Sequence, residues 1–167
     1  MNNLWKLCAL LLFLHCGAVQ AAPGDIWTGT VCKVSDGDTL IVTKDGTREN
    51  VTIRLFGIDC PETPQPYGDA ATAVATGAAL FRPVRVVEKN RDRYKRTVAD
   101  VLIIESDRSL QEMLISEGMA WVDPRFCKRC SVWEALQESA GEKRIGLWAD
   151  PAPIAPWEWR KTRRSAR

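Results

Sequence analysis

Histidine is nearly missing from this 167-residue sequence, and its one histidine, His15, stands near the start of the chain. If residues 1–21 are removed, as argued below, no histidine is left. A Ser-His-Asp triad, a Cys-His pair and a histidine-ligated zinc ion are then excluded. Any catalysis by this chain must use carboxylates, arginine, lysine, tyrosine or cysteine.

An apolar run long enough to cross a bilayer is also missing from this end of the chain. The run from Leu7 to Leu14 has about eight residues, whereas a transmembrane helix needs about 20. Lys6 precedes this run and Val19-Gln20-Ala21 follows it, which is the pattern of a signal peptide. We therefore expect residues 1–21 to be removed and the protein to be exported, to a periplasm or to the medium. Cys16 would permit a lipoprotein anchor, but the residues before it are a poor lipidation context.

Neither sign of charge is in excess, since 23 lysines and arginines face 21 acidic residues. Bulk charge alone therefore does not indicate a nucleic-acid binder. The remaining length suits one domain with a hydrophobic core. We divide the chain into a signal peptide at residues 1–21, a domain at residues 22–160 and a basic, disordered tail at residues 161–167. A phosphate-attracting arm is the alternative interpretation of the terminal charges.

Cysteines are few, and two of them, Cys127 and Cys130, form a C-x-x-C pair. In an exported chain this spacing favours a local disulfide. A redox motif would need a thioredoxin-like strand context, which the sequence does not show. Half of a zinc site is the third option, but Cys32 and Cys60, which would complete it, stand on separate strand segments.

The pattern of apolar residues and turns predicts an α+β fold. Three helices are expected, at Ala70–Phe81 with Asp69 as N-cap, at Ser109–Glu117 and at Ser131–Arg144. A sheet of five short strands with these helices indicates a five-stranded OB-type barrel. The predicted strands are Ile26–Val34, Asp38–Thr43, Val51–Phe56, Val84–Glu88 and Thr97–Ile104, the last interrupted by Asp100.

The stretch from Arg54 to Pro64 carries an arginine and two acids, Asp59 and Glu62, within nine positions. It starts as a strand and ends as a loop stiffened by prolines. Asp38, at the start of the second strand, can lie at the same end of the sheet as Asp59. Two carboxylates without histidine or thiolate partners suit Ca²⁺ or Mg²⁺, and the backbone carbonyl of Cys60 is a natural further ligand.

Two arginines near such a site, Arg54 and Arg96, indicate a substrate with several anionic oxygens. A guanidinium matches phosphate oxygens in a bidentate manner and stabilises charge that develops on phosphorus. Glu62, three residues after Asp59, could orient or deprotonate a water for attack.

Four motifs, in this order, resemble the staphylococcal (micrococcal) nuclease-like thermonuclease family. They are Val34-Ser35-Asp36-Gly37-Asp38-Thr39, the run from Arg54 to Glu62, Tyr67-Gly68-Asp69-Ala70 and Asp92-Arg93-Tyr94-Lys95-Arg96. Two later motifs, Gly146-Leu147-Trp148-Ala149 and Pro156-Trp157-Glu158-Trp159-Arg160, are similar to exported bacterial members. The resemblance extends over about residues 26 to 160.

The resemblance implies an OB barrel with three helices and a nuclease that cuts the P–O5′ bond of DNA and RNA, leaving 3′-phosphate ends. It implies a Ca²⁺ ion on the carboxylates of Asp38 and Asp59 and the carbonyl of Cys60. We expect no stable protein partner and a monomer. The remaining roles follow the same resemblance: Glu62 as general base or water-positioning group, Arg54 and Arg96 as clamps on the scissile phosphate, and Arg93 and Tyr94 as contacts to a neighbouring phosphate or base.

The sequence departs from this family at three places. Cys60 stands where the founding member has threonine, and Lys95 replaces the usual glycine before Arg96. Where tyrosines are expected for stacking on bases, the chain has Asp123, Pro124 and Phe126. Phe126 keeps an aromatic face, but an acidic Asp123 beside nucleic acid would be unfavourable.

Two other functions compete with a nuclease. A non-catalytic nucleic-acid-binding OB-type module is the first, although degenerate domains of that kind lose the carboxylates that this chain retains. An exported, disulfide-braced adhesion module that uses its tryptophans for interaction is the second. Retention of the whole charged set favours the nuclease: Asp38, Arg54, Asp59, Glu62 and Arg96.

Overall fold

A computed structural model describes residues 24–128 and 130–165. Five strands form a barrel in the order β3-β2-β1-β5-β6, and a parallel pairing of β3 with β6 closes it. This confirms the predicted α+β fold with a five-stranded OB-type barrel. The barrel strands are β1 (Ile26–Asp36), β2 (Thr39–Lys44), β3 (Asn50–Leu55), β5 (Pro83–Arg91) and β6 (Thr97–Ile103), and β7 (Arg108–Ser109) pairs beside β6.

Alternation of buried and half-buried residues explains these strands. In β6, every second side chain from Thr97 to Ile103 is buried and the ones between are half-buried, which is the period of a pleated strand. Asp100 was expected to interrupt this strand and does not. Its side chain lies on the outer face, where a carboxylate oxygen is 2.8 Å from Nζ of Lys89.

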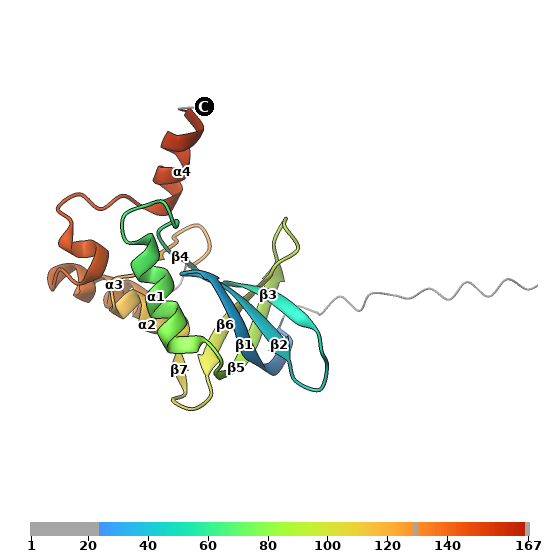
Figure 1. The fold of residues 1–167 in the computed structure, drawn as a ribbon. Helices are drawn as coiled ribbons and strands as arrows, with labels where there is room; N and C mark the ends of the chain where they lie inside the picture. Colours follow the sequence, from blue (N-terminus) through green and yellow to red (C-terminus); the bar gives the residue numbers. More distant parts are fainter. Residues whose placement is uncertain (1–23, 129, 166–167) are drawn as a thin grey trace, which may run out of the picture.

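The described residues form four α-helices, one more than the sequence predicted. Figure 1 shows α1, α2 and α3 gathered beside the barrel, and α4 standing at the end where β4 lies. A small second sheet pairs β4 with β8. These elements are β4 (Ile58–Asp59), α1 (Gly68–Ala79), α2 (Leu110–Ser116), β8 (Trp121–Val122), α3 (Ser131–Glu142), the 3-10 turn η1 (Gly146–Ala149) and α4 (Pro156–Ser165).

The start of α1 differs from the prediction, because Tyr67 and not Asp69 is the N-cap. Gly68 lies against the proline-stiffened loop so closely that a Cβ there would be 2.0 Å from the carbonyl oxygen of Glu62. The N–H of Gly68 also donates to the carbonyl of Gln65, 3.0 Å away. The loop therefore turns directly into the helix, and α1 begins before the expected cap.

The predicted disordered tail is corrected for residues 161–165, which form the last turns of α4. Pro156 takes the first helical position, where its missing N–H costs nothing and its fixed φ suits a helix. The carbonyl of Ala155 accepts the N–H of Glu158 and of Trp159, both at 3.0 Å. Glu158 and Lys161 then form an ion pair at 2.7 Å on the exposed side of the helix.

Some predictions concern residues outside the described ranges. These are the signal peptide at residues 1–21, with His15 and Cys16, and the last two residues of the tail. Within the described ranges, no helix is both long enough and apolar enough to cross a membrane.

Candidate active site

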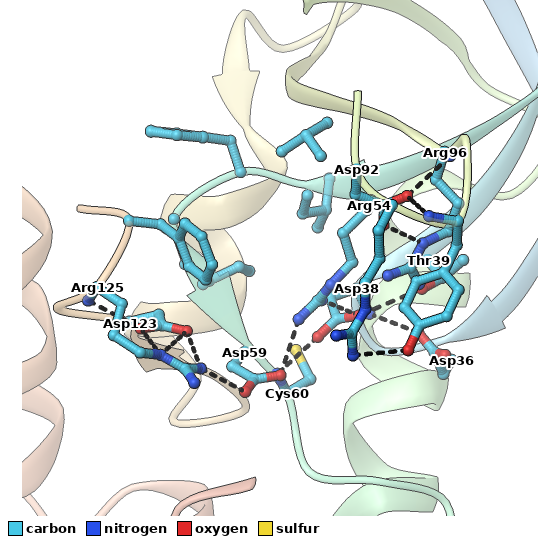
Figure 2. Close-up of a pocket in the computed structure, with 18 of the residues that line it drawn as sticks. Asp36, Asp38, Thr39, Arg54, Asp59, Cys60, Asp92, Arg96, Asp123 and Arg125 are labelled. Carbon is cyan, nitrogen blue, oxygen red and sulfur yellow. Dashed lines mark hydrogen bonds and ion pairs between the residues drawn. The ribbon is translucent and has the colours of Figure 1, made fainter. Parts of the chain in front are cut away.

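A cavity of about 930 Å³ opens at the end of the barrel where β2 begins and β3 ends. The turn before β2, the loop after β4, the β5–β6 hairpin, the loop after β8 and α4 all contribute to its walls. Figure 2 shows Asp59 and Cys60 between the side of Arg54 and the side of Arg125. The cavity is lined by all eight residues predicted for metal, phosphate or water: Asp38, Arg54, Asp59, Cys60, Glu62, Arg93, Tyr94 and Arg96.

Antiparallel pairing brings Asp38 and Asp59 to the same end of the barrel. The carbonyl of Asp38, just before β2, accepts the N–H of Leu55 at the end of β3, 2.9 Å away. Asp59 follows shortly after, at the end of β4. The two residues are only 6% and 1% exposed. Two carboxylates buried so near each other require compensating positive charge.

Arg54 supplies part of that positive charge. Its Nη1 is in ion-pair contact with Oδ1 of Asp38, and its Nη2 lies 2.8 Å from Oδ1 of Asp59. The second oxygen of Asp38 accepts the backbone N–H of Cys60 at 2.7 Å. The predicted phosphate clamp therefore also holds the two predicted metal ligands in register with each other.

Cys60 contributes its backbone and not its thiol to this arrangement. The side chain of Cys60 is buried. It packs so closely on Gly37 that a Cβ placed on Gly37 would lie 2.7 Å from the Cβ of Cys60. Burial raises the pKa of the Cys60 thiol far above its ordinary value, and the nearby Arg54 only partly opposes this. The thiol therefore stays protonated and is neither a nucleophile nor a thiolate ligand.

The loop that carries Glu62 is fixed by Gln65. The backbone N–H of Glu62 donates to Oε1 of Gln65 at 3.2 Å, and its carbonyl accepts the backbone N–H of Gln65 at 2.7 Å. The side chain of Glu62 is 41% exposed and lines the cavity. This acid is thus the accessible one of the three, which suits contact with water or substrate.

Arg160 of α4 completes the carboxylate cluster, and sequence reasoning did not assign it to the site. Its Nη2 lies 2.5 Å from Oδ2 of Asp59, and its Nη1 lies 2.5 Å from Oε1 of Glu62. Burial tends to lower the pKa of Arg160, but the hydrogen bonds that it donates to Asp59 and Glu62 outweigh this effect and raise the pKa above its usual value. The guanidinium is therefore permanently charged between two acids.

The β5–β6 hairpin presents Arg96 and is organised by Asp92. Oδ1 of Asp92 accepts the N–H of Tyr94 at 2.8 Å and of Arg96 at 3.0 Å, and Oδ2 accepts Nε of Arg96 at 2.7 Å. Burial opposes ionisation of Asp92, but these hydrogen bonds dominate and lower its pKa. Lys95, where a glycine was expected, takes the left-handed conformation with φ 64°. Lys95 therefore adopts a left-handed conformation that glycine enters at less cost.

Arg93 and Tyr94 form the outer edge of the same wall. Nη2 of Arg93 donates to the hydroxyl of Tyr94 at 2.8 Å, and the guanidinium lies 4.8 Å from the ring centroid. Tyr94 is 65% exposed. Both residues are therefore placed where a second phosphate or a base could reach them.

The opposite wall corrects the expectation that Asp123 would repel nucleic acid. Asp123 is only 2% exposed, and its carboxylate forms a fork with Arg125, with one contact of 2.5 Å and another of 2.9 Å. Burial opposes ionisation of Asp123, but the hydrogen bonds of Arg125 prevail and lower its pKa. Arg125 neutralises the acid, and beside it Phe126 is 63% exposed as an aromatic surface.

A disulfide joins Cys127 and Cys130, with their Cα atoms 5.5 Å apart. Cys127 packs beneath Gly57, which has φ +73° and where a Cβ would lie 3.0 Å from the Cys127 sulfur. The bond therefore ties the loop after β8 to the start of α3 and lies against the β3–β4 turn. Because both sulfurs are bonded, neither offers a thiolate to zinc.

Besides Arg160, sequence reasoning missed the supporting roles of Asp92, Gln65 and Arg125. Asp92 and Arg125 could have been found from spacing, because each lies within four residues of a charged partner. Arg160 gives no such signal, since its acidic partners are 98 and 101 residues away in the chain. Gln65 bonds to Glu62 three residues away, but its other partner, the carbonyl of Ile154, is 89 residues away.

Comparison with known proteins yields a consistent set of relatives. Residues 52–150 match the family model described as staphylococcal nuclease homologue. The chain is 36% identical over 156 residues to protein ParB of Escherichia coli, covering 86% of each chain. It is 35% identical over 161 residues to a Haemophilus influenzae protein described as an uncharacterized endonuclease, covering 96% of this chain and 87% of the relative. It is 31% identical over 147 residues to a micrococcal nuclease of Shigella flexneri, covering 83% of each.

Proposed function

The chain belongs to the staphylococcal nuclease homologue family and is a nuclease, and from this premise we propose that it hydrolyses phosphodiester bonds of DNA and RNA with calcium as its metal ion. The observation that carries the proposal is the cavity in which three acids meet arginines from separate walls. Asp38, Asp59 and Glu62 supply the acids, and Arg54 and Arg96 supply cations that can reach one phosphate.

The donor set fits a hard cation. Nucleases of this family are generally metal-dependent. Asp38 and Asp59 direct oxygens at the same guanidinium, so one positive ion can be shared by both carboxylates. Oxygen donors without thiolate or imidazole favour calcium or magnesium. The described residues contain no group of three or more acidic, histidine or cysteine side chains arranged for a metal. The carbonyl of Cys60 and water would therefore complete the coordination.

The bound ion would polarise the phosphate and stabilise its developing charge. Glu62 orients or deprotonates the attacking water, because its carboxylate is the exposed acid of the cluster. Arg54 and Arg96 hold the phosphate oxygens, and Asp92 keeps Arg96 in place. Attack on phosphorus breaks the P–O5′ bond and leaves a 3′-phosphate and a 5′-hydroxyl. Arg93 and Tyr94 contact a neighbouring phosphate or base.

Export belongs to the same proposal. Residues 1–21 are a signal peptide, and the mature enzyme acts in a periplasm or outside the cell. The disulfide of Cys127 and Cys130 supports this, because disulfides persist in oxidising compartments. The proposal also includes a monomeric enzyme without a stable protein partner.

The test is cleavage of plasmid DNA and of RNA by the purified protein, with calcium or with a chelator. We expect cleavage only with calcium, and fragments whose 3′ ends a polymerase extends only after phosphatase treatment. Extension without phosphatase would refute the 3′-phosphate product. Binding of both nucleic acids without any cleavage would favour the alternative, a non-catalytic nucleic-acid-binding barrel.

A further inference from the structure

The guanidinium of Arg160 fills the carboxylate cluster that the proposed reaction needs for its cation. Oδ2 of Asp59 is taken by Nη2 of Arg160 at 2.5 Å. Oδ1 of Asp59 is shared between Nη2 of Arg54 at 2.8 Å and Nη1 of Arg160 at 3.3 Å. Both oxygens of Asp59 are therefore in contact with arginines, and a divalent ion that uses Asp59 must displace one of them.

The backbone of Arg160 is held in place by the docking of α4. Nε2 of Gln65 donates to the carbonyl of Ile154 at 2.6 Å, which ties the start of α4 to the loop of Glu62. Trp157 packs edge-on against Trp121, with ring centroids 5.8 Å apart. The guanidinium stands at the end of a flexible stem on this anchored helix, so it can change partners while the helix stays in place.

Exposure and position distinguish Arg160, as the arginine that moves, from Arg54. Arg54 contacts both Asp38 and Asp59 from strand β3, on the face opposite the core-facing Ile53 and Leu55, and is 17% exposed. Arg160 approaches from the outer side, is 33% exposed and has a second partner, Glu62, that remains when Asp59 is lost. A divalent ion on Asp59 would repel a guanidinium on the same carboxylate. A phosphate in the cavity would then be the nearest strong acceptor for the displaced group.

We propose that Arg160 is a displaceable phosphate-binding residue. In the free enzyme it stands on Asp59 and Glu62 in place of the metal ion, and in the loaded enzyme it binds a substrate phosphate. The inference rests on the proposed nuclease function and adds to it a further phosphate-binding arginine, supplied by α4. The proposal predicts two opposite effects of Arg160, because this residue competes with the cation for Asp59 and binds a phosphate of the substrate.

The test measures two binding constants by calorimetry at fixed ionic strength, without relying on turnover. The ligands are calcium alone, and a nucleoside 3′,5′-bisphosphate in saturating calcium, which carries two phosphates and no diester bond. Arg160→Gln should bind calcium about tenfold more tightly, since a charged competitor is removed, and should bind the bisphosphate about tenfold more weakly. Arg163→Gln is the matched control, because Arg163 is exposed on the same helix and lies outside the described cavity lining. It should change each constant less than about twofold.

Each result decides the proposal. Weaker calcium binding by Arg160→Gln would overturn it, because Arg160 would then organise the carboxylates and not compete for them. Tighter calcium binding with unchanged bisphosphate binding would also overturn it, because Arg160 would then only block the site. If Arg160→Gln does not fold, Arg160→Lys keeps the charge without the fork. It should retain wild-type calcium affinity within about threefold and lose bisphosphate affinity.

Failure of the nuclease proposal is visible separately. A wild-type protein that binds calcium and the bisphosphate but cleaves neither DNA nor RNA would refute the proposed function while the binding constants still test Arg160. If neither the wild-type protein nor Arg160→Gln binds calcium, the competition does not exist and the inference is wrong.

Discussion

The role of Asp92 as the anchor of Arg96 can be tested by Asp92→Asn. The substitution keeps the size of the side chain and one oxygen, which can still accept the two backbone N–H groups. It removes the negative charge and the acceptor for Nε of Arg96, now at 2.7 Å. A charged hydrogen bond contributes about 1.5–3 kcal/mol when protected, and exposed ion pairs contribute less than about 1 kcal/mol. With the two side chains 20% and 30% exposed, we expect a loss of about 1–2 kcal/mol of unfolding free energy.

The pH dependence of this loss has a definite sign. The pKa of Asp92 is lower in the folded protein than in the unfolded chain, so folding favours the ionised form. The stabilisation is therefore fully present above the unfolded pKa, near 4, and is lost as the pH falls through the lower folded value. Urea unfolding at pH 7 should separate wild type from Asp92→Asn, and the difference should shrink towards pH 3.

Activity should fall as well, because Arg96 loses the group that orients it. Displacement of a reacting group by about 1 Å can cost about 100-fold in rate, so we expect kcat to fall by about 10- to 100-fold. Asp100→Asn is the control, since it breaks an ion pair with Lys89 between the same two strands but outside the described cavity lining. It should leave kcat within about twofold. Equal losses of activity in both variants, or a stability difference that does not vary with pH, would refute the anchoring role.

Three further predictions concern other parts of the cavity. Glu62→Gln should lower kcat by about 10²–10⁴-fold, the range for loss of a general base, while calorimetry shows calcium binding largely kept; lost calcium binding would make Glu62 a ligand. Cys60 should resist alkylation by iodoacetamide in the folded protein and react after denaturation, as peptide mass mapping would show; rapid labelling of the native protein would contradict its burial. Replacing Cys127 and Cys130 by serine should lower the unfolding free energy by about 2 kcal/mol, which is the entropic contribution of closing so short a loop. Urea titrations would measure this loss, and an unchanged midpoint would mean that the disulfide does not brace the cavity wall.

The barrel could be predicted from the sequence because its signals are local. Alternation along β6 and the turns between strands depend on residues next to each other in the chain. The strands β4 and β8 were not predicted, because Ile58–Asp59 and Trp121–Val122 have two residues each and two residues define no period. These two segments form strands only because they pair with each other.

The carboxylate pair could be predicted for a different reason. Asp38 immediately precedes β2, and Asp59 follows the antiparallel neighbour β3 by four residues, so the pairing of β2 with β3 brings the two acids to the same end of the barrel. Arg160 could not be predicted in this way, because it reaches Asp59 across 101 positions of sequence. Its place depends on the docking of α4 through Gln65 and Trp157, and no helix was predicted at this end of the chain.

Four groups of the cavity have pKa values that are shifted away from neutral pH. Ion pairs lower the pKa of Asp92 and of Asp123, and contacts with carboxylates raise that of Arg160. Burial raises the pKa of Cys60, and the described residues that line the cavity include no histidine. Each of these shifts moves a group further from neutral pH. These four groups therefore keep their charge state near neutral pH, and a ligand would change the cavity by displacing an existing partner. Asp59 is where such an exchange would begin, because its carboxylate contacts Arg54 and Arg160 and lies 4.0 Å from Arg125.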